Sequence, residues 1–117
     1  MAARLARLKQ RAEFLRVAEA RRKSPKPGLV LQAAAQPLPG ELRVGFTVTK
    51  KVGNAVVRNR TKRRLRAAAA EVMPNAEPGH DYVLIGRDGT AARPWNELKD
   101  DIETALRSLR LWRGTSH

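Results

Sequence analysis

The sequence predicts an α+β fold, a small two-layer sandwich in which helices pack on a mixed sheet. The main observation is the order of the hydrophobic periods along the chain, which runs helix, strand, strand, helix, strand, helix. Size is the other, because 117 residues, 42% of them hydrophobic, suffice for one modest core but not for two. We therefore expect a single domain over residues 1–117, with disorder confined to residues 1–6 and 113–117.

The first third of the chain predicts one helix followed by two strands. Apolar residues recur at helical spacing over residues 7–20, and Pro25 and Pro27 end that helix. Residues 29–33, "LVLQA", have the composition of a strand, and residues 42–49 alternate apolar and polar side chains in the period of a strand. Because a short turn-rich connection separates these strands, we expect them to form an antiparallel hairpin.

A change to helical period predicts the central helix. Gly53 permits a positive φ, and Asn54 is a favourable N-cap for a helix that starts at Ala55 and ends before Pro74. Its side chains divide into a core-facing stripe and an opposite polar face. The stripe comprises Val57, Thr61, Leu65, Ala68, Ala69 and Val72, and the polar face comprises Asn59, Arg60, Arg63 and Arg66.

The last third predicts a buried strand and a terminal helix. Residues 80–87, "HDYVLIGR", have the β-branched and aromatic content of a third strand. From Pro94 onward, apolar residues repeat every three or four positions as far as Trp112, which predicts a helix with one buried seam. Its acidic start suits the helix dipole, and we expect those side chains to be solvated. The acidic residues are Glu97, Asp100, Asp101 and Glu103.

Charge is the strongest functional signal in the sequence. The net charge is +13, and eight Lys or Arg residues lie between Lys50 and Arg66, whereas no acidic residue occurs from Leu42 through Ala70. Without acidic neighbours these cations have no i,i+4 partners, and Arg matches phosphate oxygens in two contacts. The pattern predicts a phosphate-binding surface. Nucleic acid is the first candidate partner and an anionic membrane the second, and the residues alone do not decide between them.

Nothing in the sequence indicates a catalytic centre. Cys is absent, and the two His residues, His80 and His117, have no companion at metal-ligand spacing. Metal-assisted phosphodiester cleavage needs converging carboxylates, and the basic region supplies none. We therefore expect no catalytic residue, no metal and no cofactor on the protein. With no membrane span or signal-peptide pattern, we expect a cytoplasmic protein.

Residues 50–66, "KKVGNAVVRNRTKRRLR", closely resemble the signature of the bacterial ribonuclease P protein family. Weaker matches in "RLKQRAEF", "RVGFTVTKK" and "HDYVLIGR" extend the resemblance over most of residues 7–110. The resemblance implies a left-handed βαβ crossover and a partner that is a large catalytic RNA holding Mg²⁺. It also implies binding of the 5′ leader of precursor tRNA, to promote its endonucleolytic removal. Membrane and DNA are then not expected as partners. The alternative is a structural RNA-binding protein, such as a small ribosomal protein.

The resemblance, together with the charge pattern and the expected placement of the elements, indicates which residues touch RNA. The residues expected to contact RNA are Lys50, Lys51, Asn54, Arg58, Asn59, Arg60, Lys62, Arg63, Arg64 and Arg66. The residues expected along the leader are Arg11, Phe14, Val30 and Gln32, with Lys51 nearby. Ala18 and Gln32 stand where relatives often have aromatic residues. Phe14 is therefore expected either to stack on a leader base or to be a core residue.

Overall fold

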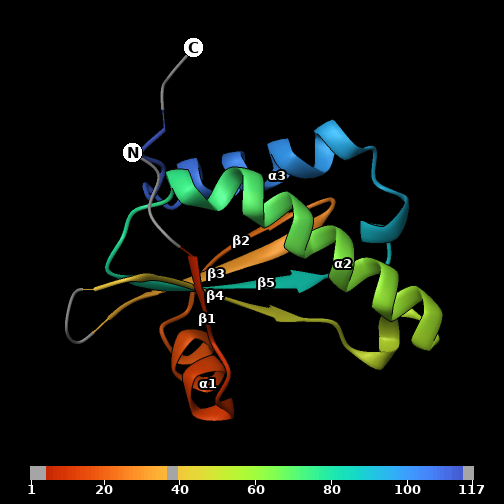
Figure 1. The fold of residues 1–117 in the computed structure, drawn as a ribbon, viewed down its shortest axis with the longest axis horizontal. Helices are drawn as coiled ribbons and strands as arrows, with labels where there is room; N and C mark the ends of the chain where they lie inside the picture. Colours follow the sequence, from red (N-terminus) through yellow and green to blue (C-terminus); the bar gives the residue numbers. More distant parts are fainter. Residues whose placement is uncertain (1–4, 37–39, 115–117) are drawn as a thin grey trace.

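Within the residues that the structure describes, a five-stranded sheet packs with three helices (Figure 1). The structure is a computed structural model that describes residues 5–36 and 40–114. The strands are β1 Leu5–Arg7, β2 Arg22–Lys26, β3 Leu29–Ala35, β4 Leu42–Thr47 and β5 His80–Gly86. The helices are α1 Arg11–Glu19, α2 Ala55–Val72 and α3 Trp95–Ser108. Short 3₁₀ turns lie at η1 Lys50–Val52, η2 Met73–Asn75 and η3 Thr90–Ala92.

The sheet is mixed, as the fold prediction requires. Its strand order is β1-β4-β5-β3-β2. β1 and β5 both run parallel to β4, whereas β3 runs antiparallel to its two neighbours, β5 and β2. The adjacent parallel strands β4 and β5 are joined through α2, so this part of the chain is a βαβ unit. The α+β prediction is therefore confirmed.

The predicted hairpin of β3 and β4 is wrong. β5 lies between these two strands, and β3 forms its hairpin with β2 instead, with Pro25 opposite Val30. The prolines suggested a break in structure, but β2 is an edge strand of the sheet, where a residue without an N–H is tolerated. The sequence analysis also missed β1, which has only three residues and too little pattern to detect. α1 consequently begins at Arg11 rather than at residue 7.

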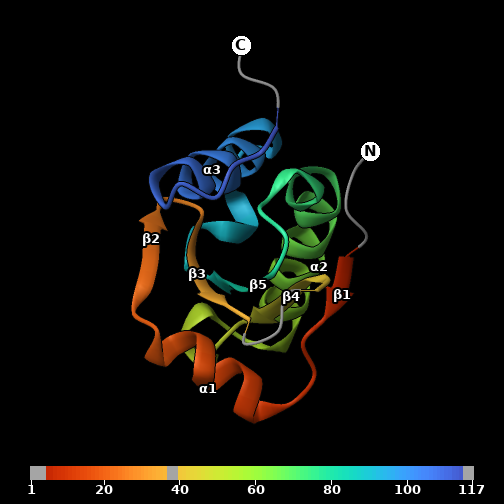
Figure 2. The same ribbon diagram turned by 90° about the vertical axis from the view of Figure 1, so that its left-hand side faces the viewer.

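The helices lie on both faces of the sheet, so α1 adds a third layer to the two that the sequence predicts. Figure 2 shows α2 and α3 together on one face and the shorter α1 on the other. The main core fills the space between the sheet and the α2–α3 pair, and it includes Leu31, Leu65, Leu84 and Ile102, all fully buried. A second, smaller cluster lies under α1 and contains Leu8, Val17, Ala34 and Val83. α1 therefore has an anchor of its own, apart from the main core.

The buried seam predicted for α3 is confirmed in its middle, whereas Trp95, Leu109 and Trp112 are only partly buried and the helix ends at Ser108, before the last two. Leu98, Ile102 and Ala105 are fully buried, while Glu97 and Asp100 are exposed as expected. Asp101, however, is buried, and the expectation that it is solvated is wrong. Its Oδ2 accepts hydrogen bonds of 2.9 Å from the Gly28 amide and 2.9 Å from Arg93 Nε. The β2–β3 turn thus covers Asp101, and Arg93 compensates its charge.

The structure describes only some of the residues at the two chain ends. The disorder expected for residues 1–6 and 113–117 falls mainly on residues that are not described, although Leu5 and Ala6 belong to β1. The Arg113 amide donates a 2.7 Å hydrogen bond to the Asn75 carbonyl. None of the helices in the described ranges is long and apolar enough to cross a membrane.

Candidate nucleic-acid interface

The start of α2 is built as its sequence predicts. Gly53 adopts a φ of +150°, and Asn54 Oδ1 accepts a 3.0 Å hydrogen bond from the Val57 amide. This bond satisfies one of the amides that every helix leaves unpaired in its first turn. Just before it, η1 carries Lys50 and Lys51, both exposed. Two ammonium groups therefore lie next to the positive end of the α2 dipole.

The predicted division of α2 into two faces is also confirmed. The residues buried on the inner face are Thr61, Leu65, Ala68, Ala69 and Val72. The residues of the predicted polar face, Asn59, Arg60, Arg63 and Arg66, are all exposed, and Lys62 beside them is partly exposed. The inner face fixes the rotation of the helix, because its apolar side chains pack on the main core. That rotation turns the basic face toward solvent.

The cations of α2 form two groups with different roles. Arg58 and Arg64 are engaged within the protein: Arg58 donates a 3.1 Å hydrogen bond to the Gly53 carbonyl, and the Arg64 guanidinium binds three carbonyls around η3. By contrast, the side chains of Arg60, Lys62, Arg63 and Arg66 make no hydrogen bond or ion pair with the described residues, and neither do those of Lys50 and Lys51. These six cations are available for an external anion. Their contacts with RNA remain a prediction.

Arg64 has a structural task that the sequence did not reveal. Its Nη1 donates to the Thr90 and Ala91 carbonyls, its Nη2 donates to the Arg93 carbonyl, and its guanidinium lies 5.8 Å from the centre of the Trp95 ring. These bonds tie α2 to the segment that leads into α3. The sequence analysis grouped Arg64 with the residues expected to contact RNA, and only the position of η3 makes it an anchor.

A second candidate surface lies on the sheet face that α1 covers in part. Paired residues of neighbouring strands point to the same face, so Gln32, Val83 and Gly45 form one row and Val30, Ile85 and Thr47 form the next. The Phe14 ring lies on the first row, at Gly45. A Cβ atom at Gly45 would come within 2.6 Å of the ring, so glycine is what permits this approach.

The predicted leader residues are thus partly gathered by the structure. Phe14 is half-buried against the small cluster under α1, and Val30 and Gln32 are half-buried on the same face of β3. Arg11 is exposed in the first turn of α1. Phe14 was expected either to stack on a leader base or to be a core residue, and its half-buried state lies between these two cases. Its ring packs on the protein and keeps part of its surface exposed.

The sequence analysis missed two sets of basic residues, one beside Gln32 and one beside Lys51. Gln32 lines a hollow together with Val17, Ala18 and the consecutive cations Arg21, Arg22 and Lys23. A separate hollow brings Lys51 beside Arg87, at the ends of β4 and β5. The sequence contains a signal for the first, three consecutive basic residues, but the sequence analysis assigned them no role. No local signal placed Arg87 near Lys51.

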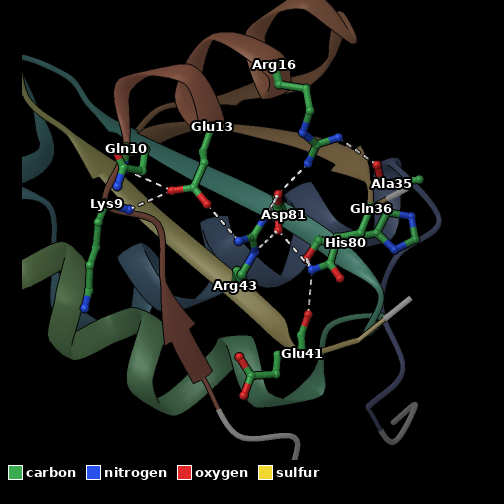
Figure 3. A network of polar contacts seen from close by, with 10 residues as sticks. All are labelled: Lys9, Gln10, Glu13, Arg16, Ala35, Gln36, Glu41, Arg43, His80 and Asp81. Atoms are coloured by element: carbon green, nitrogen blue, oxygen red, sulfur yellow. Dashed lines mark hydrogen bonds and ion pairs between the residues drawn. The ribbon is translucent and has the colours of Figure 1, made fainter. Parts of the chain in front are cut away.

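A charged network fixes α1 on the sheet (Figure 3). The Asp81 carboxylate, fully buried on β5, receives hydrogen bonds from Arg43 on β4, from Arg16 on α1 and from Gln36. Arg43 also pairs with Glu13 of α1 at 2.7 Å. Glu13 in turn accepts the amides of Lys9 and Gln10 at 3.1 and 2.9 Å, which caps the helix. One network therefore positions the helix that carries Phe14.

The network keeps its two acids ionised. Burial alone would raise the pKa of Asp81, but hydrogen bonds from Arg43, Arg16 and Gln36 outweigh it and lower the pKa below its usual value. The pKa of Glu13 is lowered chiefly by the amides of Gln10 and Lys9, with Arg43 contributing. Carboxylates paired in this way stabilise the attachment of α1 at neutral pH.

The acidic residues do not gather into a metal site. Within residues 5–36 and 40–114, no group of three or more His, Asp or Glu side chains is arranged to hold a metal ion. Three acids of α3 pair with cations instead, Glu97 and Asp101 with Arg93 and Glu103 with Arg107. The two candidate surfaces described above are bordered by cations. Their chemistry suits the binding of phosphate groups.

Comparison with known proteins agrees with this chemistry. The sequence profile of the Ribonuclease P family matches residues 2–110. The chain is 58% identical over 116 residues to the ribonuclease P protein component of Paramagnetospirillum magneticum, covering 93% of this chain and 86% of that protein. It is 36% identical to the component of Bacillus velezensis, covering 94% of each. No support for a ribosomal protein comes from these matches.

Solved structures share the fold. The structure of a Staphylococcus aureus RNase P protein mutant with defective mRNA degradation activity aligns with a TM-score of 0.78 at 24% identity, covering 91% of this chain and 89% of that one. The RNase P protein from Thermotoga maritima aligns with a TM-score of 0.73 at 21% identity, covering 88% and 96%. By its sequence, this chain belongs to the Ribonuclease P family.

Proposed function

We propose that this chain is the protein component of a bacterial ribonuclease P, a ribonucleoprotein that removes the 5′ leader from precursor tRNA. The observation that carries the proposal is the face of α2, where Arg60, Lys62, Arg63 and Arg66 point outward without partners among the described residues. Membership in the family supports the choice of an RNA subunit as the polyanion that this face binds. The compartment proposed is the cytoplasm, and neither membrane nor DNA is a proposed partner.

The catalytic RNA subunit is assigned to the α2 surface. Six cations, the four above together with Lys50 and Lys51, are unpaired within the described part of the chain and lie along η1 and α2 as far as Arg66. Asn54 and Arg58 stabilise the start of α2. Asn54 accepts a hydrogen bond from the Val57 amide, and Arg58 donates one to the Gly53 carbonyl. Neutralising about six phosphates gives an expected log–log slope of affinity against salt of about −4 to −5.

The single-stranded leader is assigned to the other face of the sheet. Phe14 offers a half-buried ring, and Val30 and Gln32 line the exposed part of the same face. Arg11 and Lys51 are the proposed phosphate contacts. Stacking on an aromatic ring tolerates any base, which suits an enzyme that must act on many different leaders. α2 and α1 lie on opposite faces of the sheet, so the RNA subunit and the leader use different surfaces apart from Lys51, which is assigned to both (Figure 2).

Cleavage is assigned to the RNA subunit, and the protein acts by binding. Metal-assisted hydrolysis requires oxygen ligands that converge on the scissile phosphate, and the surfaces proposed for RNA present cations and amides instead. The Mg²⁺ ions are accordingly placed on the RNA. The role of the protein is then to raise the affinity for precursor tRNA and to reduce electrostatic repulsion between two polyanions.

Reconstitution tests the proposal. The purified chain is added to a bacterial ribonuclease P RNA, and cleavage of precursor tRNA is followed at a Mg²⁺ concentration too low for the RNA alone. We expect the chain to restore cleavage at the mature 5′ end, and the quadruple variant of Arg60, Lys62, Arg63 and Arg66 to Ala to lose this effect. Failure of the folded wild-type chain to bind the RNA or to stimulate cleavage would refute the proposal.

A further inference from the structure

A hollow on the outer face of α2 combines apolar and polar chemistry. It is lined by Val56, Asn59, Lys62, Arg63 and Arg66. Val56, Asn59, Arg63 and Arg66 follow one another at spacings of three and four residues, so they lie along one stripe of the helix. Phosphate neutralisation by the cations does not require Val56, whose surface is 69% exposed.

Val56 is distinguished by its surroundings. A single exposed apolar residue is ordinary on a protein surface, and Leu15 on α1 is another, 47% exposed. Val56, however, lines a hollow beside the Asn59 amide, which makes no hydrogen bond with the described residues and can both donate and accept. Lys62, Arg63 and Arg66 on the same hollow are also unpaired within the described ranges.

This combination matches the parts of a single nucleotide. An apolar side chain packs on the face of a base, an amide bonds to its edge, and cations bind the flanking phosphates. A base inside an A-form duplex hides both of its faces by stacking, so only an unstacked base can use the first of these contacts. An acidic peptide would satisfy the cations but would leave Val56 without a flat apolar partner.

We propose that this hollow receives one unstacked nucleobase of the RNA subunit. Val56 packs on the base, Asn59 bonds to its edge, and Lys62, Arg63 and Arg66 hold the adjacent phosphates. The inference rests on the proposed function and adds to it the kind of nucleotide that α2 recognises. α2 then contributes selectivity for a particular RNA site as well as general affinity.

The test separates base contacts from phosphate contacts. Wild type, Val56→Ala, Asn59→Ala, Arg63→Ala and the matched control Leu15→Ala are titrated with the RNA subunit and with a fully paired RNA duplex at several salt concentrations. For the RNA subunit we expect losses of about 5-fold for Val56→Ala and about 10-fold for Asn59→Ala, with the salt slope unchanged. Arg63→Ala should weaken both RNAs and reduce the salt slope by about 1.

The duplex and the control decide the interpretation. On the duplex, Val56→Ala and Asn59→Ala should match wild type, because no base is unstacked, and Leu15→Ala should match wild type on both RNAs. Dimethyl sulfate and 2′-hydroxyl acylation probing should show a nucleotide of the RNA subunit that wild type protects and Val56→Ala leaves reactive. Circular dichroism verifies that every variant is folded.

Several outcomes would overturn the inference. Affinity for the RNA subunit equal to wild type in both Val56→Ala and Asn59→Ala would show that no base enters the hollow. Equal losses on subunit and duplex would indicate contact with riboses in the minor groove instead. In either case the proposed function stands, because wild type still binds the RNA subunit. Failure of wild type itself to bind would overturn the proposed function and this inference together.

Discussion

Arg63 and Arg64 are neighbours in the sequence, and the structure predicts opposite consequences when each is replaced by alanine. Arg63 is exposed and makes no hydrogen bond or ion pair with the described residues, whereas Arg64 holds the carbonyls of Thr90, Ala91 and Arg93. Loss of Arg63 should therefore weaken RNA binding without affecting stability. Loss of Arg64 should destabilise the fold.

The expected magnitudes follow from these contacts. Arg64→Ala removes three hydrogen bonds and the contact with the Trp95 ring. Each hydrogen bond contributes about 1 kcal/mol net, and water replaces part of it at this half-buried site, so we expect a loss of about 2–3 kcal/mol in the free energy of unfolding. For a domain of this size that corresponds to a decrease in Tm of roughly 6–12 °C. Arg63→Ala should change the free energy of unfolding by less than about 0.5 kcal/mol.

Two measurements on wild type, Arg63→Ala and Arg64→Ala test this assignment. Urea unfolding followed by circular dichroism gives the free energy of unfolding, and titration of the RNA subunit at several salt concentrations gives the affinity and its salt slope. Arg63→Ala should lower the magnitude of the slope by about 1. Equal stability of Arg64→Ala and wild type, or destabilisation by Arg63→Ala, would refute the assignment of the two side chains to different faces.

Three further predictions concern the leader surface, the core and the charged network. At saturating RNA subunit, Phe14→Ala should weaken the binding free energy of precursor tRNA with a long leader by up to about 1–3 kcal/mol. The binding of leaderless tRNA should not change, and equal losses on both substrates would show that Phe14 is purely a core residue. Ile102→Ala, at a fully buried site, should lower the free energy of unfolding by about 2–5 kcal/mol in urea titrations, and a loss below about 1 kcal/mol would contradict the packing of α3. Because the folded-state pKa of Asp81 is lowered, its contribution to stability is complete above the unfolded pKa of about 4 and is lost as pH falls through the folded pKa. Unfolding measured between pH 7 and pH 2 should show this loss in wild type and a smaller one in Asp81→Asn; identical pH dependences would exclude Asp81 as the titrating group.

The sequence by itself determined the features that depend on a few neighbouring residues. The cap at Asn54, the positive φ of Gly53 and the extent of α2 are local properties, and the structure reproduces them. The separation of its apolar and basic faces follows from helical period, which a sequence displays directly. The basic surface was predictable for the same reason: its cations are adjacent in sequence, and no distant acid reaches them in the described part of the chain.

Tertiary structure alone decided the order of the strands and the roles of individual charged residues. β5 enters between β3 and β4, a pairing between segments distant in sequence that no local pattern specifies. Asp81 and Asp101 are buried because cations from other elements reach them, Arg43 and Arg93 respectively. Arg64 differs from Arg63 because η3 packs beside only one of them. A helix rotates by about 100° per residue, so neighbouring side chains meet different surroundings, and those surroundings exist only once the whole chain has folded.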